Sequence, residues 1–191
     1  MEGQYKNINE GLINACRKGD RKAQFELYKQ YSKAMFNTCI RILNNSAEAE
    51  DVMQDGFLKA FQNIDSYSGT VSFGAWLKKI VINTALDAVR KRKLEFESID
   101  NLKVPVYDED TEVDEAEVEY QVEQVKHAIN TLADGYRIVL SLNLLEGYDH
   151  DEISEILGIS ASTSRSQLVR AKKKLLELLN AKVKDSENGQ A

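Results

Sequence analysis

The chain has 191 residues, of which 42% are hydrophobic and 29% charged, enough for one large or two small folded domains and too apolar for a disordered protein. Its net charge is −6. Two cysteines and two histidines are too few for a disulfide framework or a metal cluster, so we expect no cofactor. With no apolar run of about 18 residues and no signal-peptide layout, we expect a cytoplasmic protein without direct membrane insertion.

Segment 46–64 predicts a helix that Ser46 is placed to cap. Its buried face follows the three-four spacing of an amphipathic helix and comprises Ala49, Val52, Met53, Phe57, Ala60, Phe61 and Ile64. The opposite stripe carries carboxylates, amides and one leucine: Asp51, Gln54, Asp55, Leu58 and Gln62. Such a surface suits a basic protein partner, because burial of the leucine awaits another molecule. A solvated face with one stray leucine is the alternative.

Segment 65–92 predicts a Ser/Gly-rich loop up to Ser72 and a helix that begins at Phe73 and ends near Arg92. The narrow buried stripe comprises Leu77, Val81, Thr84 and Ala88. The helix ends in a basic cluster at 90–93, and the face roughly opposite the buried stripe carries Trp76, Lys79, Ile80, Asn83 and Arg90, with Asp87 among them. Aromatic, amide and basic groups on one face are typical of single-stranded nucleic-acid binding. A core tryptophan beside a charged helix end is the alternative.

Acidity is concentrated in the middle of the chain. Segment 94–126 has 12 acidic and 2 basic residues, whereas 1–93 has 10 acidic and 15 basic residues. The acidic run also contains Pro105, the single proline, and cannot bury enough apolar surface to fold alone. We therefore expect two small helical domains at 1–94 and 125–184, an acidic flexible linker at 95–124, and a polar tail at 185–191.

The second domain predicts a helix-turn-helix. Asp149 and Glu152 have the spacing of a capping box, Gly158 suits a left-handed helix end, and Ser160 can cap a following helix from Ala161. That helix separates a small and basic stripe from a packing stripe that comprises Ser164, Leu168, Ala171, Leu175 and Leu178. The basic stripe suits the major groove of DNA and comprises Ser162, Thr163, Arg165, Ser166, Val169, Arg170 and Lys173. A solvated surface helix is the alternative.

These segments, in this order, resemble extracytoplasmic-function (ECF) bacterial sigma factors. The resemblance rests on "AEDVMQDGFLKAF", "SFGAWLKKIVINTALDAVRKRK" and "INTLADGYRIVLSLNLLEGYDHDEISEILGISASTSRSQLVRAKKKLLELL". It implies that the first segment docks on the clamp of the RNA polymerase β′ subunit, and that the second recognises and melts the minus-ten element. It also implies that the loop before the second segment captures a flipped-out base, and that the third segment reads the minus-thirty-five element.

Three positions depart from the family pattern. The family usually has proline where this chain has Ala133, a β-branched apolar residue in place of Ser164, and often arginine in place of Gln167. None is a base-reading position. Because Ser164 falls on the packing stripe, we expect the DNA-reading helix to be seated more loosely.

The resemblance implies an all-α protein that is not an enzyme and whose partners are core RNA polymerase (β′ clamp and β flap), promoter DNA and an anti-sigma factor. A stand-alone helix-turn-helix regulator is the main alternative, and it would need neither the docking stripe nor the melting segment. A small nucleic-acid-processing enzyme would need clustered carboxylates for two metal ions, which the consecutive acids of the linker do not provide.

Overall fold

The computed structural model describes residues 8–96 and 116–188 and divides the chain into two compact units, 1–95 and 96–191. The described residues form helices joined by turns and short loops and contain no strand, which confirms the all-α prediction. No helix among them is both long enough and apolar enough to cross a membrane. Most of the predicted linker, residues 97–115, lies outside the described residues. Its two ends are helical, because α4 ends at Phe96 and α5 begins at Ala116, and α8 extends to Asn188, inside the predicted tail.

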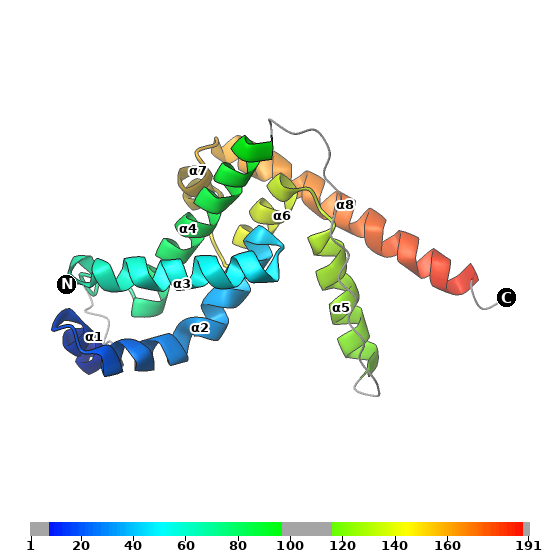
Figure 1. The fold of residues 1–191 in the computed structure, drawn as a ribbon. Helices are drawn as coiled ribbons and strands as arrows, with labels where there is room; N and C mark the ends of the chain where they lie inside the picture. The colour runs from blue at the N-terminus through cyan, green and yellow to red at the C-terminus, as the bar shows by residue number, and fades with distance from the viewer. Residues whose placement is uncertain (1–7, 97–115, 189–191) are drawn as a thin grey trace. The chain divides into compact units, whose positions relative to one another are not determined.

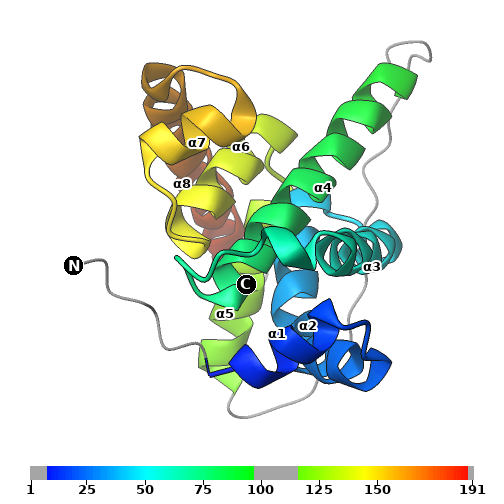
Figure 2. The same ribbon diagram turned by 90° about the vertical axis from the view of Figure 1, so that its left-hand side faces the viewer.

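The first unit contains α1 (Glu10–Arg17), α2 (Arg21–Leu43), α3 (Ser46–Gln62), the 3₁₀ turn η1 (Ile64–Ser66) and α4 (Phe73–Phe96). Helices α2 and α3 lie side by side, and α4 crosses α3 (Figures 1 and 2). The crossing is close: a Cβ atom added at Gly56 of α3 would lie 2.7 Å from Val81 Cγ2 of α4. Only glycine at this position allows the two helices to approach this far. The core of this unit includes the fully buried side chains of Leu27, Phe73 and Leu77.

The turn between α2 and α3 corrects one sequence prediction. Asn44 ends α2 in the left-handed conformation (φ 55°), and the side chain of Asn45, rather than Ser46, caps α3 by accepting a hydrogen bond from Glu48 N at 3.0 Å. Asparagine satisfies a free N–H at a helix start as well as serine does. The predicted start of α4 at Phe73 is confirmed, with Ser72 Oγ accepting a hydrogen bond from Ala75 N at 3.2 Å.

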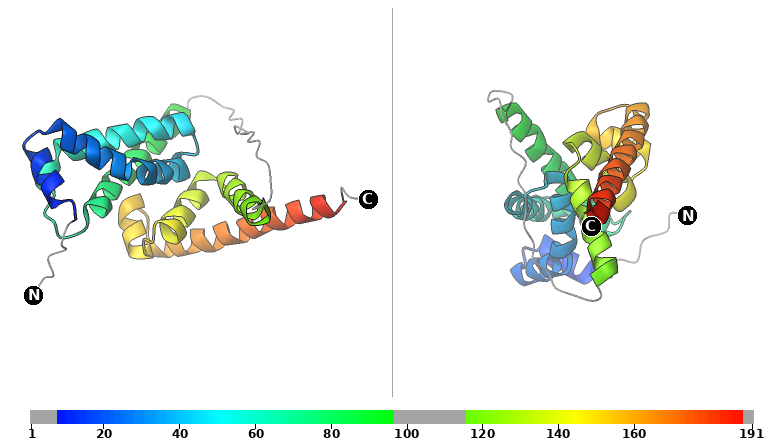
Figure 3. Two further views of the ribbon diagram at one scale, coloured as in Figure 1. Left: turned by 90° about the horizontal axis from the view of Figure 1, so that it is seen from below. Right: turned by 90° about the vertical axis from the view of Figure 1, so that its right-hand side faces the viewer.

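The second unit contains α5 (Ala116–Asn130), α6 (Asp134–Leu140), the π-helical turn η2 (Ser141–Leu145), α7 (His150–Leu157) and α8 (Ala161–Asn188). Helices α6 and α7 pack against the N-terminal part of the long α8, and α5 packs further along it (Figure 3). In η2, Glu146 N donates to Ser141 O at 3.0 Å, a bond that spans five residues instead of the four of an α-helix. Leu140, Leu142 and Ile153 form the centre of this unit.

Candidate nucleic-acid and protein interfaces

Helix α3 presents the predicted docking stripe to solvent. Asp51, Gln54, Asp55 and Leu58 are all exposed, and 59% of the Leu58 surface is accessible. The opposite side of the helix is buried, as predicted, except that Phe61 is only half-buried. The stripe is therefore one continuous surface of carboxylates and an amide around an unburied leucine.

A groove of about 550 Å³ lies between α2 and α3 beside this stripe. Gln54 and Leu58 line it from α3, while Arg21 and Phe25 line it from α2. Phe25 is 58% exposed, so it adds a second large apolar side chain to the surface. Sequence analysis missed Phe25. The available signal was its position in the helix: Ala23 and Leu27, four residues apart, lie on the buried face, and Phe25 lies between them in sequence and therefore on another face.

Helix α4 carries the predicted aromatic, amide and basic face. Lys79, Asn83 and Arg90 are exposed, and Trp76 and Ile80 are half-buried. The Trp76 ring is tilted against Tyr67 and Phe73, with ring centroids 5.3 and 5.6 Å away. Trp76 is thus anchored on one side by an aromatic cluster while part of its surface stays accessible, so both alternatives that the sequence left open remain compatible with its position.

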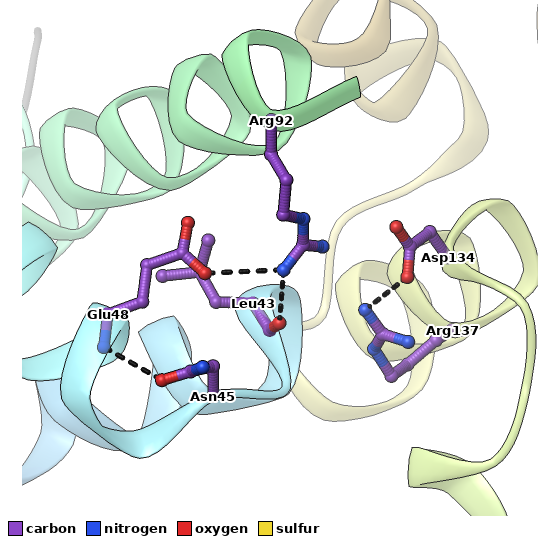
Figure 4. A network of polar contacts seen from close by, with 6 residues as sticks. All are labelled: Leu43, Asn45, Glu48, Arg92, Asp134 and Arg137. Carbon is purple, nitrogen blue, oxygen red and sulfur yellow. Dashed lines mark hydrogen bonds and ion pairs between the residues drawn. The ribbon is translucent and has the colours of Figure 1, made fainter. Parts of the chain in front are cut away.

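The basic cluster at the end of α4 does not act as one group. Arg92 Nη1 lies 3.2 Å from Glu48 Oε2 and donates to Leu43 O at 3.3 Å, so it ties α4 to the turn between α2 and α3 (Figure 4). Arg90 Nη1 lies 3.0 Å from Asp87 Oδ1 on the exposed surface. The sequence predicted one basic cluster at 90–93. In the structure Arg92 makes an intramolecular contact, because the carboxylate of Glu48 on α3 pairs with its guanidinium.

The loop before α4 is held by contacts that sequence analysis did not identify. Tyr67 is buried, its hydroxyl donates to Val71 O at 2.6 Å, and Arg17 Nη2 donates to Tyr67 O at 2.6 Å. Tyr67 also touches Trp76. The loop and the aromatic residue of the candidate DNA face are therefore connected through one side chain.

Helices α7 and α8 form the predicted helix-turn-helix. The Asp149 carboxylate accepts hydrogen bonds from the backbone, and Glu152 completes the capping box; Gly158 has φ 69°, and Ser160 Oγ accepts from Thr163 N at 3.1 Å. Beside the box, burial raises the pKa of the Tyr148 phenol, and the negative charges of Glu146 and Glu152 raise it further.

The basic stripe of α8 faces solvent, as predicted. Ser162, Arg165, Ser166, Val169, Arg170 and Lys173 are exposed or partly exposed, and Thr163 is half-buried. Val169 is 68% exposed, an apolar contact surface between cations that matches the chemistry of a thymine methyl group. Leu168 and Ala171 are buried on the opposite side. The structure thus separates the packing stripe from the stripe expected to read DNA.

Ser164 does not loosen the packing of α8 against α7. It is fully buried, and its Oγ lies 2.8 Å from Nδ1 of His150 at the start of α7. A polar contact fills the place where the family has an apolar side chain. The two helices of the helix-turn-helix are therefore joined by a hydrogen bond as well as by apolar packing.

We expect His150→Ala to lower the free energy of unfolding of the second unit by about 1–3 kcal/mol, because it leaves the buried Ser164 hydroxyl without a partner. Removing both polar partners in His150→Ala/Ser164→Ala should recover most of that loss. Urea denaturation of the four proteins of this cycle measures the coupling, with Ser166→Ala as an exposed-serine control. A double variant less stable than His150→Ala alone would contradict the assignment.

Two family models match the chain, one in each half. Residues 27–95 match the family model described as Sigma-70 region 2, and residues 122–175 match Sigma-70, region 4. The chain is similar to the ECF RNA polymerase sigma factor SigW of Bacillus subtilis (30% identity over 87% of this chain and 94% of the relative). It is also similar to the ECF RNA polymerase sigma-E factor of Haemophilus influenzae (28% identity over 86% of this chain and 91% of the relative).

Among solved structures, the fold resembles the sigma factor RpoE from Bartonella quintana, crystallised in complex with the anti-sigma factor NepR. The TM-score is 0.59 at 25% identity, over 81% of this chain and 95% of that one.

Proposed function

The chain belongs to the ECF sigma factors of RNA polymerase, and from this premise we propose which of its surfaces performs each step of initiation. A sigma factor binds core RNA polymerase, directs it to promoters and takes part in melting the DNA; it is an initiation factor and not an enzyme. The observation that carries the assignment is that α3, α4 and α8 each carry an accessible surface of different chemistry.

The α3 stripe is the proposed docking surface for the β′ clamp. Leu58 supplies the apolar contact that complex formation would bury, and Asp51, Gln54 and Asp55 around it orient a basic partner. Charged groups at the rim of an interface mainly steer association and fix its register. The neighbouring Phe25 extends the apolar part of this surface.

The α4 face is the proposed minus-ten surface. Trp76 and Ile80 provide apolar groups against which an unstacked base can rest, Asn83 can bond a base edge, and Lys79 and Arg90 hold phosphate. The Asp87 carboxylate beside Arg90 must give way when Arg90 reaches a phosphate. Arg92 is left out of this surface, since its guanidinium is engaged by Glu48 and Leu43 O.

The α8 stripe is the proposed minus-thirty-five surface, with bases read by Arg165, Ser166, Val169 and Arg170, and phosphate contacted by Lys173. An arginine with two bonds to guanine discriminates between bases, whereas a lysine on a phosphate adds affinity without sequence preference. Ser162 and Thr163 lie at the N-terminal end of the helix, and their hydroxyls can form hydrogen bonds with a base edge or with a phosphate.

Arg165→Ala and Arg170→Ala should therefore cost about 1–3 kcal/mol of promoter affinity and relax the preferred sequence. Lys173→Ala should weaken binding to all sequences alike and reduce the salt dependence of binding. Holoenzyme binding to a library of minus-thirty-five variants, measured at several salt concentrations, separates the two effects. Equal losses of selectivity in all three variants would contradict this division.

The partners follow from the same proposal. We include the β flap of polymerase as a contact of the second unit. We also include an anti-sigma factor as a regulator, since the RpoE relative was crystallised with the anti-sigma factor NepR. The cytoplasmic location predicted from the sequence belongs to this proposal, because core polymerase and promoter DNA are found there.

In vitro transcription from a genomic library with purified core polymerase tests the function as a whole. We expect the chain to copurify with core polymerase and to start transcription at a defined set of promoters. A stand-alone regulator would bind DNA without associating with core polymerase, which is the outcome that would overturn the assignment.

A further inference from the structure

The loop that precedes α4 (residues 67–72) has a defined closed shape. The Tyr67 hydroxyl at its start donates to Val71 O near its end at 2.6 Å. Inside the loop, the hydroxyls of Ser68 and Thr70 lie 3.0 Å apart, and Gly69 has φ 78°, a conformation that glycine adopts without strain. One side chain therefore spans the loop and holds its two ends together.

The start of this loop is also tied to the first helix. Arg17 Nη2 donates to Tyr67 O at 2.6 Å, while Nη1 of the same guanidinium donates to Asn14 Oδ1 at 3.0 Å. Arg17 ends α1, so the backbone of Tyr67 is fixed from outside the loop. Arg17 at the end of α1 thus holds the carbonyl of Tyr67, and the hydroxyl of Tyr67 holds the carbonyl of Val71 at the other end of the loop.

The ring of Tyr67 supports the DNA face of α4. It is 4% exposed, stands edge-on to Phe73 at 5.7 Å and is tilted against Trp76 at 5.3 Å. Val71, whose carbonyl accepts the hydroxyl, keeps 47% of its own surface exposed. Through Tyr67, the loop backbone and the Trp76 ring are therefore placed relative to each other.

Such bracing matters because a loop that must order its backbone on binding loses affinity to conformational entropy. A loop that is already in its bound shape avoids that loss. Extruding a base from the duplex is itself unfavourable, so the site that receives the base gains most from being formed in advance.

We propose that Tyr67 is the positioning residue of the strand-opening surface: its hydroxyl holds loop 67–72 in the shape that receives an unstacked promoter base, and its ring supports Trp76. This inference rests on the proposed role of the α4 face in opening the minus-ten element. It assigns to Tyr67, and to Arg17 behind it, an effect on DNA opening although neither side chain is expected to touch DNA.

Tyr67→Phe tests the inference, because it removes the hydroxyl and keeps the ring. Holoenzyme with this variant should form about three- to tenfold fewer open complexes, the population change that one net hydrogen bond supports. Binding to core polymerase and formation of the closed complex should not change. Permanganate reactivity of unpaired thymines measures opening, and thermal unfolding verifies that the variant is folded.

Tyr31→Phe is the matched control. Tyr31 belongs to the same aromatic cluster, with its ring 5.5 Å from Phe73, but its hydroxyl accepts from Asn9 Nδ2 instead of holding the loop. We expect wild-type opening from this variant. Arg17→Gln, a change at an exposed side chain, should reduce opening in the same direction as Tyr67→Phe.

Promoters that lack a single base in the non-template strand show whether the hydroxyl acts through base capture. If the missing base is the captured one, its removal should reduce opening by the wild type, and Tyr67→Phe should cause no further reduction on that promoter. If a different base is missing, the reduction caused by the missing base and the reduction caused by Tyr67→Phe should add. A deficit that is the same on every template, or full opening by Tyr67→Phe, overturns the inference. Wild-type holoenzyme that opens no promoter contradicts the proposed function and this inference together.

Discussion

Leu58→Asp should reduce affinity for core RNA polymerase by about a hundredfold while the chain stays folded. The side chain is 59% exposed, so the change removes little internal packing. In the complex it would place an unpaired carboxylate in a desolvated contact, the kind of central position where one substitution removes several kcal/mol of binding energy. Titration of labelled chain with core polymerase measures the affinity.

Two further variants sharpen this experiment. Leu58→Met keeps an apolar side chain of similar volume and should bind core polymerase nearly as well as wild type. Asp51→Arg, which reverses one charge of the same stripe, should also weaken binding strongly if the stripe meets a basic partner. Normal binding by both Leu58→Asp and Asp51→Arg, with unchanged circular dichroism, would show that this face of α3 is not the docking surface.

Trp76→Ala and Asn83→Ala should lower promoter melting by at least about tenfold with little effect on closed-complex formation. Each extruded base is unfavourable by a few kcal/mol, so the loss of one group that receives it has a large effect on opening. Permanganate reactivity reports opening, and filter binding reports the closed complex. Lys33→Ala, an exposed change on α2, serves as the control.

A pre-melted promoter separates the two roles. Trp76, which packs on Tyr67 and Phe73, offers a surface that takes the place of a neighbouring base pair, so a mismatched bubble should restore much of the activity of Trp76→Ala. Asn83 is exposed and can bond a base edge, so its loss should persist on the bubble. Wild-type melting by both single variants would return Trp76 to a purely structural role.

The parts of the fold that depend on nearby residues were predictable from sequence. The capping box of Asp149 and Glu152 and the left-handed Gly158 span a few positions, and the structure has them as predicted. At the start of α3 the same reasoning chose Ser46, but Asn45 is the cap. Three consecutive residues there can cap a helix, and the choice depends on where α2 ends, which the local pattern does not determine.

Contacts between distant residues account for what the sequence did not show. Glu48 and Arg92 are 44 positions apart, so nothing in the basic run at 90–93 distinguished Arg92 from its neighbours. His150 and Ser164 are 14 positions apart, and without that contact a serine on a packing stripe indicates only a looser fit. The roles assigned to the site residues remain predictions, since exposure shows availability and not use.

The π-helical turn at Ser141–Leu145 bears on how the second unit tolerates changes in chain length. A turn that closes over five residues contains one more residue than regular α-helix at the same place. Its last two residues, Leu144 and Leu145, are about half exposed, whereas Leu140 and Leu142 beside them are buried. A relative one residue shorter here could continue a regular helix without moving the buried leucines. Single-residue gaps between family members are therefore expected to fall at this turn, where the helix can absorb them before the DNA-reading elements begin.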